Sequence, residues 1–350
     1  MPGFTGADRV ILPMSRKPPP PLISARGFIR GSVVRRIHYR YQRTLANSAE
    51  IAGIGFITGS PVRVRLRPAP ADTGVSFVRT DRKGSPTIPA RATVVSDTRR
   101  RTTIGSGDDS VTLVEHLLAA LAGMRVDNCL IEIDGPEAPG LDGSSGGFAR
   151  AIGHAGVVTQ PSRRPIVSVT SPMTVCERGA TITVHPASDE TLRISYVLDY
   201  GLTAAIPRQS VSFDMTPELF QREIADNRTF LLESEAVELR NQGIGKNMTW
   251  ADVLVFGPRG VIDNTLRHAD EPARHKVLDL IGDLFLSGLD LAGHIVAYRS
   301  GHQLNVELAK RLAEGWERYS KNESGSVRNE ERSQSLGEPE RPKLKVFRAA

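Results

Sequence analysis

The chain has 350 residues, of which 39% are hydrophobic and 24% are charged, so it is long enough to bury the cores of two domains. It contains no apolar run of the eighteen or so residues that a membrane span needs, and no apolar segment typical of a signal peptide follows Met1. The net charge of +6 arises in residues 1–43, which hold nine of the 45 basic residues but one of the 39 acidic residues. The rest of the chain is nearly neutral, which disfavours a nucleic-acid-binding surface there.

Residues 1–42 are predicted to form a basic, proline-containing extension that is disordered, because the tract KPPPPL suits neither a helix nor a central strand. An arginine-rich, acid-poor leader is also typical of a transit peptide, which would direct the protein to an organelle. Otherwise we expect a cytoplasmic protein. Its two cysteines, Cys129 and Cys176, lie in separate strand-like segments and are expected to be reduced.

Short strands and helices alternate from about residue 43 onward. In residues 43–161 we expect strands at 62–68 and 127–136, a helix at 113–124, and a second helix that opens at Phe148. The pattern then starts again in residues 162–310, with strands near 166–178, 180–185 and 192–199 and helices at 216–226 and 272–288. Residues 311–350 are expected to contain the end of a helix and a flexible charged tail.

These patterns predict an α+β protein with two similar domains, each a small sheet layered with two helices. The domains would meet near residue 162, and an active site would lie at their interface. We expect a monomer without a transmembrane segment.

The segment RHKVLDLIGDLF, residues 274–285, combines an apolar helical stripe with a polar series of period four, His275, Asp279 and Asp283. Such a series lies along one edge of the stripe. It could be a solvated helix edge, and His275 and Asp279 could instead hold a metal ion. The spacing alone does not decide between these alternatives.

A catalytic metal site needs about three protein ligands and a neighbouring base. His116, in TLVEHLLAAL, would complete a His₂Asp set with His275 and Asp279, and Glu115 beside it could act as the general base. Thr112 and Glu115 also match a capping box, so Glu115 could simply cap a helix.

A further acid or base is suggested by His302, which follows a Ser-Gly turn in YRSGHQLN and could be presented from a loop. Asp283 is placed to hold that imidazole in one tautomer. As alternatives, the turn could be an ordinary one, and each histidine could be a structural residue of the core.

Five segments carry a resemblance to the UDP-3-O-acyl-N-acetylglucosamine deacetylase family, the zinc amidases of bacterial lipid A biosynthesis. They span both halves of the chain, over roughly residues 43–309, and read PAPADTGVSFVRTD (68–81), TLVEHLLAALAGMRVDNCLIEIDGPE (112–137), RTF (228–230), RHKVLDLIGDLFLSG (274–288) and YRSGHQLN (298–305). The resemblance implies hydrolysis of the N-acetyl group of UDP-3-O-acyl-N-acetylglucosamine with release of acetate. The implied cofactor is Zn²⁺, and the implied partner is this nucleotide-sugar rather than nucleic acid.

The resemblance also implies a role for each site residue. His116, His275 and Asp279 would be the zinc ligands, and Glu115 the general base. His302, supported by Asp283, would stabilise the tetrahedral state and protonate the leaving amine. Thr229 would donate to the oxyanion and Lys276 would contact the substrate. Phe230 would border the acyl passage beside an inserted βαβ element near residues 231–255, and Glu235 would bind the sugar.

The chain departs from the family pattern at several places. GFITG (55–59) has Ile57 where a histidine is usual, and GKNMTWADVLVF (245–256) replaces a Gly-Gly-Ser-Leu-Asp-like stretch. These departures concern substrate contacts and the acyl passage rather than the implied metal ligands. They leave open a non-catalytic relative that binds a nucleotide-sugar or RNA.

Overall fold

The computed structural model of the protein describes residues 33–201, 204–245 and 253–335. Its first five-stranded sheet has the order β2 (Ala49–Ile54), β3 (Pro61–Pro68), β9 (Cys129–Ile133), β4 (Val75–Arg79) and β5 (Ile88–Pro89). Two helices belong to this half, α1 (Glu115–Gly123) and α2 (Gly146–Ala155). A small sheet and two short 3-10 turns complete it, namely β6 (Val95–Asp97), β7 (Thr103–Ile104), β8 (Val111–Thr112), Ala92–Val94 and Gly107–Asp109.

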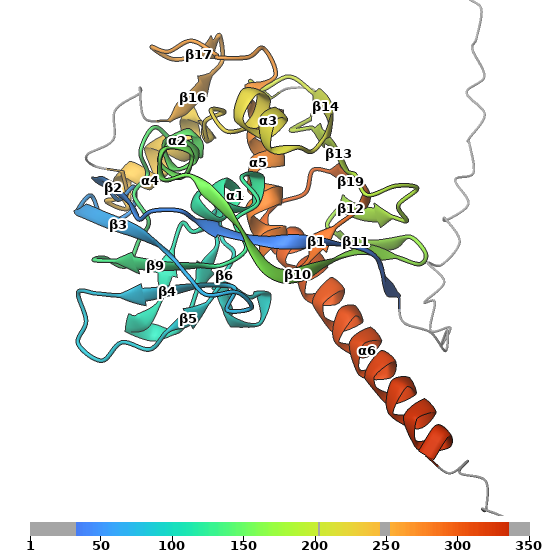
Figure 1. The fold of residues 1–350 in the computed structure, drawn as a ribbon. Coiled ribbons are helices and arrows are strands. Elements are labelled where there is room, and N and C mark those ends of the chain that lie inside the picture. The colour runs from blue at the N-terminus through green and yellow to red at the C-terminus, as the bar shows by residue number, and fades with distance from the viewer. Residues whose placement is uncertain (1–32, 202–203, 246–252, 336–350) are drawn as a thin grey trace, which may run out of the picture. The chain divides into compact units, whose positions relative to one another are not determined.

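The second five-stranded sheet has the order β11 (Met173–Glu177), β12 (Ala180–His185), β19 (Gly293–Tyr298), β13 (Leu192–Leu198) and β14 (Gln209–Asp214). Helices α5 (Glu271–Phe285) and α6 (His302–Ser335) pack against it. The short α3 (Pro217–Leu219) continues directly into a π-helical turn, Phe220–Ile224, where the sequence predicts one helix. A further three-stranded sheet consists of β1 (Val34–Leu45), β10 (Val157–Val169) and β18 (Asp290–Leu291). Its long strands β1 and β10 run from one half to the other, as Figure 1 shows.

The predicted insert is a βαβ unit within the described residues. Strand β15 (Phe230–Leu232) leads into α4 (Glu233–Asn241) and pairs in parallel with β16 (Leu254–Gly257), which turns back into β17 (Gly260–Val261). Residues 246–252, part of the segment that departs from the family pattern, lie outside the described residues.

In the strands of these sheets, buried apolar side chains alternate with more exposed ones. In β3, Val62, Val64 and Leu66 point into the core while the arginines between them face outward. Helix α1 is apolar almost all round, and Leu117, Leu118 and the residues next to them are fully buried.

Helices α1 and α5 pack directly against each other, which brings the two halves together. The contact is closest at Gly282 of α5, where an added Cβ would lie 2.1 Å from the backbone oxygen of Glu115. Only a residue without a side chain allows this approach, because the neighbouring atoms are backbone. The start of α1 is therefore held against the C-terminal part of α5.

The α+β class is confirmed, with several small sheets and six helices among the described residues. The prediction that the disordered extension reaches residue 42 is wrong, because β1 begins at Val34 and pairs with β10 as far as Val169. The sequence VRRIHYRYQRTL favours a strand here despite its charge, since Val34 and Leu45 face the core. Residues 1–32 lie outside the described residues.

Two further boundaries differ from the prediction. Strand β10 runs through the expected junction at 161/162 without a break. The expected charged tail is helical as far as Ser335: no proline interrupts α6 before that point, and the helix accommodates Gly315 and Gly325. The polar composition of the residues after 310 is therefore compatible with a regular helix up to Ser335. No helix of the described residues is both long enough and apolar enough to cross a membrane.

Candidate active site

One cavity of about 530 Å³ collects nearly all the residues that the sequence singles out. Its lining includes Glu115, His116, Thr229, Phe230, Glu235, His275, Lys276, Asp279 and His302. Asp283 lies behind His302 rather than on the cavity wall. The predicted residues thus come from both halves of the chain and meet where α1 and α5 pack.

The candidate metal ligands are His116 on α1 and His275 and Asp279 on α5. One ligand atom from each of them falls in a group whose members lie within 4.8 Å of one another, and all three residues are buried. Oδ1 of Asp279 is 3.2 Å from Nε2 of His275 and 3.6 Å from Nε2 of His116. This oxygen is buried and has no hydrogen-bond partner among the described residues. Two imidazole nitrogens and one unsatisfied carboxylate oxygen fit a divalent metal ion.

The charge states of these ligands suit a cation. Burial would raise the pKa of Asp279, but His275 and Lys276 outweigh it and hold that pKa well below its usual range. Burial lowers the pKa of His275 against the pull of Asp279, so the ring is neutral. Nδ1 of His275 lies 3.0 Å from the carbonyl oxygen of Asn227. Since a carbonyl can only accept, Nδ1 carries the proton and Nε2 presents a lone pair to the group.

Glu115 opens α1 and lies beside the candidate metal ligands with 2% of its surface exposed. Its carboxylate accepts a hydrogen bond from the backbone N–H of Thr102 at 3.0 Å. Burial raises the pKa of Glu115, and the nearby His302 and His116 offset only part of that rise. The capping-box alternative is not formed, because Thr112 contacts Thr103 and Arg101 and the helix start has no side-chain cap.

His302 is the first residue of α6, and not a loop residue as the sequence suggested. Its Nδ1 donates to Oδ2 of Asp283 at 2.9 Å, and its Nε2 lies 3.9 Å from Oε1 of Glu115. Burial would lower the pKa of His302, but Asp283, Asp279 and Glu115 outweigh it and raise that pKa to about 9. The imidazole is therefore charged at neutral pH and can give up a proton.

Asp283 is fully buried and held by partners that the sequence did not reveal. The hydroxyl of Thr102 donates to its Oδ1 at 2.6 Å, and the amide of Asn305 donates to its Oδ2 at 2.9 Å. Asn305 stands three residues after His302, a spacing that places both on one helix face and could have been noticed. Thr102 has no such signal, because it lies in the connection between the short strands β6 and β7, directly before β7.

Thr229 and Phe230 enter the cavity at the start of β15. The backbone N–H of Thr229 donates to the carbonyl of Gly143 at 2.8 Å, which ties this segment to the other half of the chain. The ring of Phe230 meets that of His275 edge to face, and Nζ of Lys276 lies 5.5 Å from the centre of the Phe230 ring. Lys276 also donates to Oδ2 of Asp279 at 2.8 Å.

Glu235 lines the cavity but is engaged in the fold. Its carboxylate accepts from the backbone N–H of Leu232 at 2.9 Å, at the start of α4, and pairs with Arg100 at 3.2 Å. Arg101, next to Arg100, is half-buried on the cavity wall. Among the described residues, its guanidinium donates one hydrogen bond, to the hydroxyl of Thr112.

The remaining cavity wall is largely apolar. It includes Phe56, Ile57, Leu113, Tyr200, Leu231, Leu239, Ile244, Val253 and Leu304. Ile57, which stands where the family usually has a histidine, is one of these residues, and its backbone N–H donates to Glu137 at 2.7 Å. Leu113 holds a left-handed backbone (φ 58°) just before α1, a strained conformation that is typical of functional sites.

Taken together, a buried ligand set, a base and a charged acid around one partly apolar cavity are the parts of a hydrolytic metalloenzyme. The family model for LpxC, UDP-3-O-acyl N-acetylglycosamine deacetylase, matches residues 42–314 of the chain. The UDP-3-O-acyl-N-acetylglucosamine deacetylase of Nostoc sp. is 42% identical over 276 residues, covering 77% of this chain and 98% of the relative.

Two further relatives bear the same name. The protein of Thermosynechococcus vestitus is 43% identical over 273 residues, covering 78% of this chain and 94% of its own length. The protein of Chlamydia caviae is 39% identical over 276 residues, covering 79% and 98%. The chain belongs to the LpxC family, which confirms the resemblance predicted from the motifs. These relatives are named as deacetylases, which are hydrolases, and this agrees with the enzyme class predicted from the motifs.

Proposed function

We propose that the protein is a zinc-dependent amidase that removes the N-acetyl group from UDP-3-O-acyl-N-acetylglucosamine, an early committed step of lipid A biosynthesis. The observation that carries the proposal is the unsatisfied, buried Oδ1 of Asp279 facing the imidazole nitrogens of His116 and His275. Zn²⁺ suits this donor set of two nitrogens and one oxygen. A zinc ion held there would polarise the amide carbonyl and acidify a water molecule.

Glu115 is the proposed general base. Its carboxylate lies beside the ligand group and is oriented by the Thr102 N–H, so it can take a proton from the attacking water. The water oxygen then bonds to the carbonyl carbon, and the hydroxyl of Thr229 is available to stabilise the negative charge on the former carbonyl oxygen.

His302 is the proposed general acid. With its pKa raised to about 9 it is protonated at neutral pH, and Nε2 faces the cavity because Nδ1 is bound to Asp283. Its proton passes to the nitrogen as the C–N bond breaks, which releases acetate and a free amine. Lys276 would bind the substrate close to these groups.

The rest of the cavity matches the rest of the substrate. The apolar wall suits the 3-O-acyl chain, with Phe230 at its border. Arg101 has no carboxylate partner among the described residues and can bind the diphosphate, which is attached to the sugar carbon next to the one that bears the N-acetyl group. Glu235 would bind a sugar hydroxyl in addition to its contact with Leu232. The two free cysteines, Cys129 buried and Cys176 exposed, fit the cytoplasm as the expected location.

Metal analysis beside a deacetylation assay tests the proposal. Wild type should hold one zinc per chain and release acetate, and His275→Ala should lose the zinc while keeping a folded circular dichroism spectrum. Glu115→Ala should keep the zinc yet lose about a hundredfold or more in kcat. Wild-type turnover in Glu115→Ala, or stoichiometric zinc in His275→Ala, would show that these roles are misassigned.

A further inference from the structure

The segment 227–229 reaches the metal ligands without belonging to a helix or a strand. The carbonyl of Asn227 accepts from Nδ1 of His275 at 3.0 Å, and Thr229 stands two residues further on at the cavity wall. Between them lies Arg228, which is 5% exposed. A short irregular segment thus carries both the group that orients His275 and the proposed oxyanion donor, so something else must hold it in place.

That support comes from Glu271, which is fully buried in the first turn of α5. Its Oε1 accepts from the backbone N–H and from Nε of Arg228, at 3.0 and 2.9 Å. Its Oε2 accepts from Nη2 of Arg228 at 3.2 Å and from the backbone N–H of Arg267 at 2.7 Å. Both oxygens of the carboxylate are therefore fully used, and they hold the main chain of residue 228 as well as its guanidinium.

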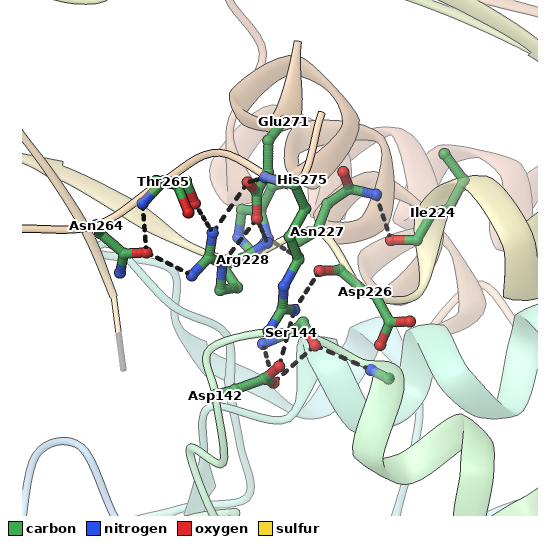
Figure 2. A network of polar contacts seen from close by, with 12 residues as sticks. Asp142, Ser144, Ile224, Asp226, Asn227, Arg228, Asn264, Thr265, Glu271 and His275 are labelled. Carbon is green, nitrogen blue, oxygen red and sulfur yellow. Dashed lines mark hydrogen bonds and ion pairs between the residues drawn. The ribbon is translucent and has the colours of Figure 1, made fainter. Parts of the chain in front are cut away.

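The arginine in turn ties down a neighbouring loop. Nη1 of Arg228 donates to the side chain of Asn264 at 3.0 Å, and Nη2 donates to the carbonyl of Thr265 at 2.7 Å. Arg267 then reaches Asp142 of the other half at 2.9 Å. Figure 2 shows Arg228 between Glu271, Asn264 and Thr265, with His275 and Asn227 beside it.

Glu271 and His275 stand four residues apart on α5, so they lie on neighbouring turns of the same helix face. The contacts therefore close a ring from Glu271 to Arg228, through the Asn227 carbonyl to His275, and back along the helix. A ring of this kind fixes the carbonyl relative to the imidazole. It thereby fixes the tautomer and the direction of Nε2.

We propose that Arg228 and Glu271 are a positioning pair that holds the Asn227 carbonyl against His275, and so sets the affinity of the site for its metal ion. The inference rests on the proposed function, since it concerns the same metal site. Partners that orient a ligating histidine typically contribute 10–100-fold to metal affinity. Glu271→Gln keeps the size of the side chain but removes its charge, and we expect it to bind zinc at least tenfold more weakly.

The measurement is zinc affinity by competition with a chromophoric chelator, made on folded protein well below its melting temperature. Glu223→Gln is the matched control, because the Glu223 carboxylate pairs with Arg274 at 2.7 Å between the same two parts of the chain. Glu223 meets residues 227–229 through its backbone carbonyl, which accepts from the Asn227 side chain at 2.7 Å and which the substitution leaves in place. Val64→Ala, in the fully buried core of the first sheet, controls for lowered stability. Both controls should bind zinc within about twofold of wild type.

A metal-free readout accompanies the affinity. Histidine ¹⁵N chemical shifts should show His275 protonated on Nδ1 in wild type and a mixture of tautomers in Glu271→Gln. Should that variant be unfolded, Arg228→Lys takes its place, because lysine keeps the charge but cannot span Glu271, Asn264 and Thr265 at once. If the folded variant bound zinc as tightly as wild type, the inference would be wrong, while the proposed function would still stand. Absence of zinc binding in wild type would overturn the proposed function and the inference with it.

Discussion

Substitution of Gly282 by alanine tests how closely the site depends on the packing of α1 against α5. The added Cβ would lie 2.1 Å from the backbone oxygen of Glu115 and 2.8 Å from its carbonyl carbon. An unstrained carbon–oxygen contact is about 3.3 Å or longer, so the two helices would have to separate by roughly 1 Å. No side chain can rotate away to relieve this clash, because the opposing atoms are backbone.

The cost should appear in both stability and catalysis. Overpacking of a core by one methyl group costs about 1–3 kcal/mol, and each kcal/mol lowers the Tm of a sizeable domain by about 2–4 °C. The separation would also move Glu115 and His116 away from Asp279, which stands one turn before Gly282. A misplacement of about 1 Å costs on the order of a hundredfold in rate, so kcat/KM should fall by about that factor.

Calorimetry and the deacetylation assay measure the two effects, with Gly153→Ala as the matched control. Gly153 lies on α2, and an added Cβ there would meet no atom within 4 Å. The control should leave kcat/KM unchanged and raise stability by up to about 1 kcal/mol, as expected for Gly to Ala in an exposed helix. If Gly282→Ala had the Tm and kcat/KM of wild type, the two helices would not set the geometry of the site as described.

Three further outcomes are expected. The plot of kcat/KM against pH should be bell-shaped. On the acidic side, kcat/KM should fall below the pKa of Glu115, which burial raises above 4.5, because the base must be ionised. On the basic side, it should fall as the pH rises through about 9, because His302 must be protonated. His302→Ala should abolish the basic limb, and a limb that persists would assign the acid elsewhere. A chain beginning at Ser32 should melt within about 2 °C of the full chain, whereas one beginning at Gln42 should melt at least about 5 °C lower, because it loses the buried Val34 and the Arg40 partner of Asp127. Equal melting temperatures would show that the first part of β1 adds no stability. Thr102→Val, which removes the hydroxyl that Asp283 accepts from, should lower kcat/KM, and an unchanged rate would show that this contact does not matter.

Those parts of the molecule with a regular period were predictable from the sequence. The apolar stripe of 274–285 gave α5, and the same spacing placed His275 and Asp279 side by side, as the structure has them. Period-two alternation likewise predicted β3, and the strands expected at 180–185 and 192–199 correspond to β12 and β13 of the second sheet, whereas its strands β14 and β19 were not predicted. In each case the signal is local, because residues a few positions apart decide the element.

What could not be predicted depends on contacts between distant segments. Glu271 looks like an ordinary acid at a helix start, and its burial against Arg228 follows only from the tertiary fold. Thr102 lies in the short connection before β7, which has no sequence pattern of its own, yet it contacts Glu115 and Asp283. The start of β1 was missed for the opposite reason: its charges suggested disorder, and pairing with β10 outweighed them.

The two contacts of Thr102 have a consequence for how the active site can vary. Its backbone N–H orients the proposed base and its hydroxyl orients the partner of the proposed acid, so proton removal and proton delivery share one anchor. Groups that share a partner do not respond independently to substitution. Changes at Glu115 and Asp283 should therefore show epistasis: the effect of either depends on the state of the other, although 168 positions separate them in the chain. The connection between β6 and β7, which carries Thr102, would then evolve together with both helices of the site rather than as an independent surface segment.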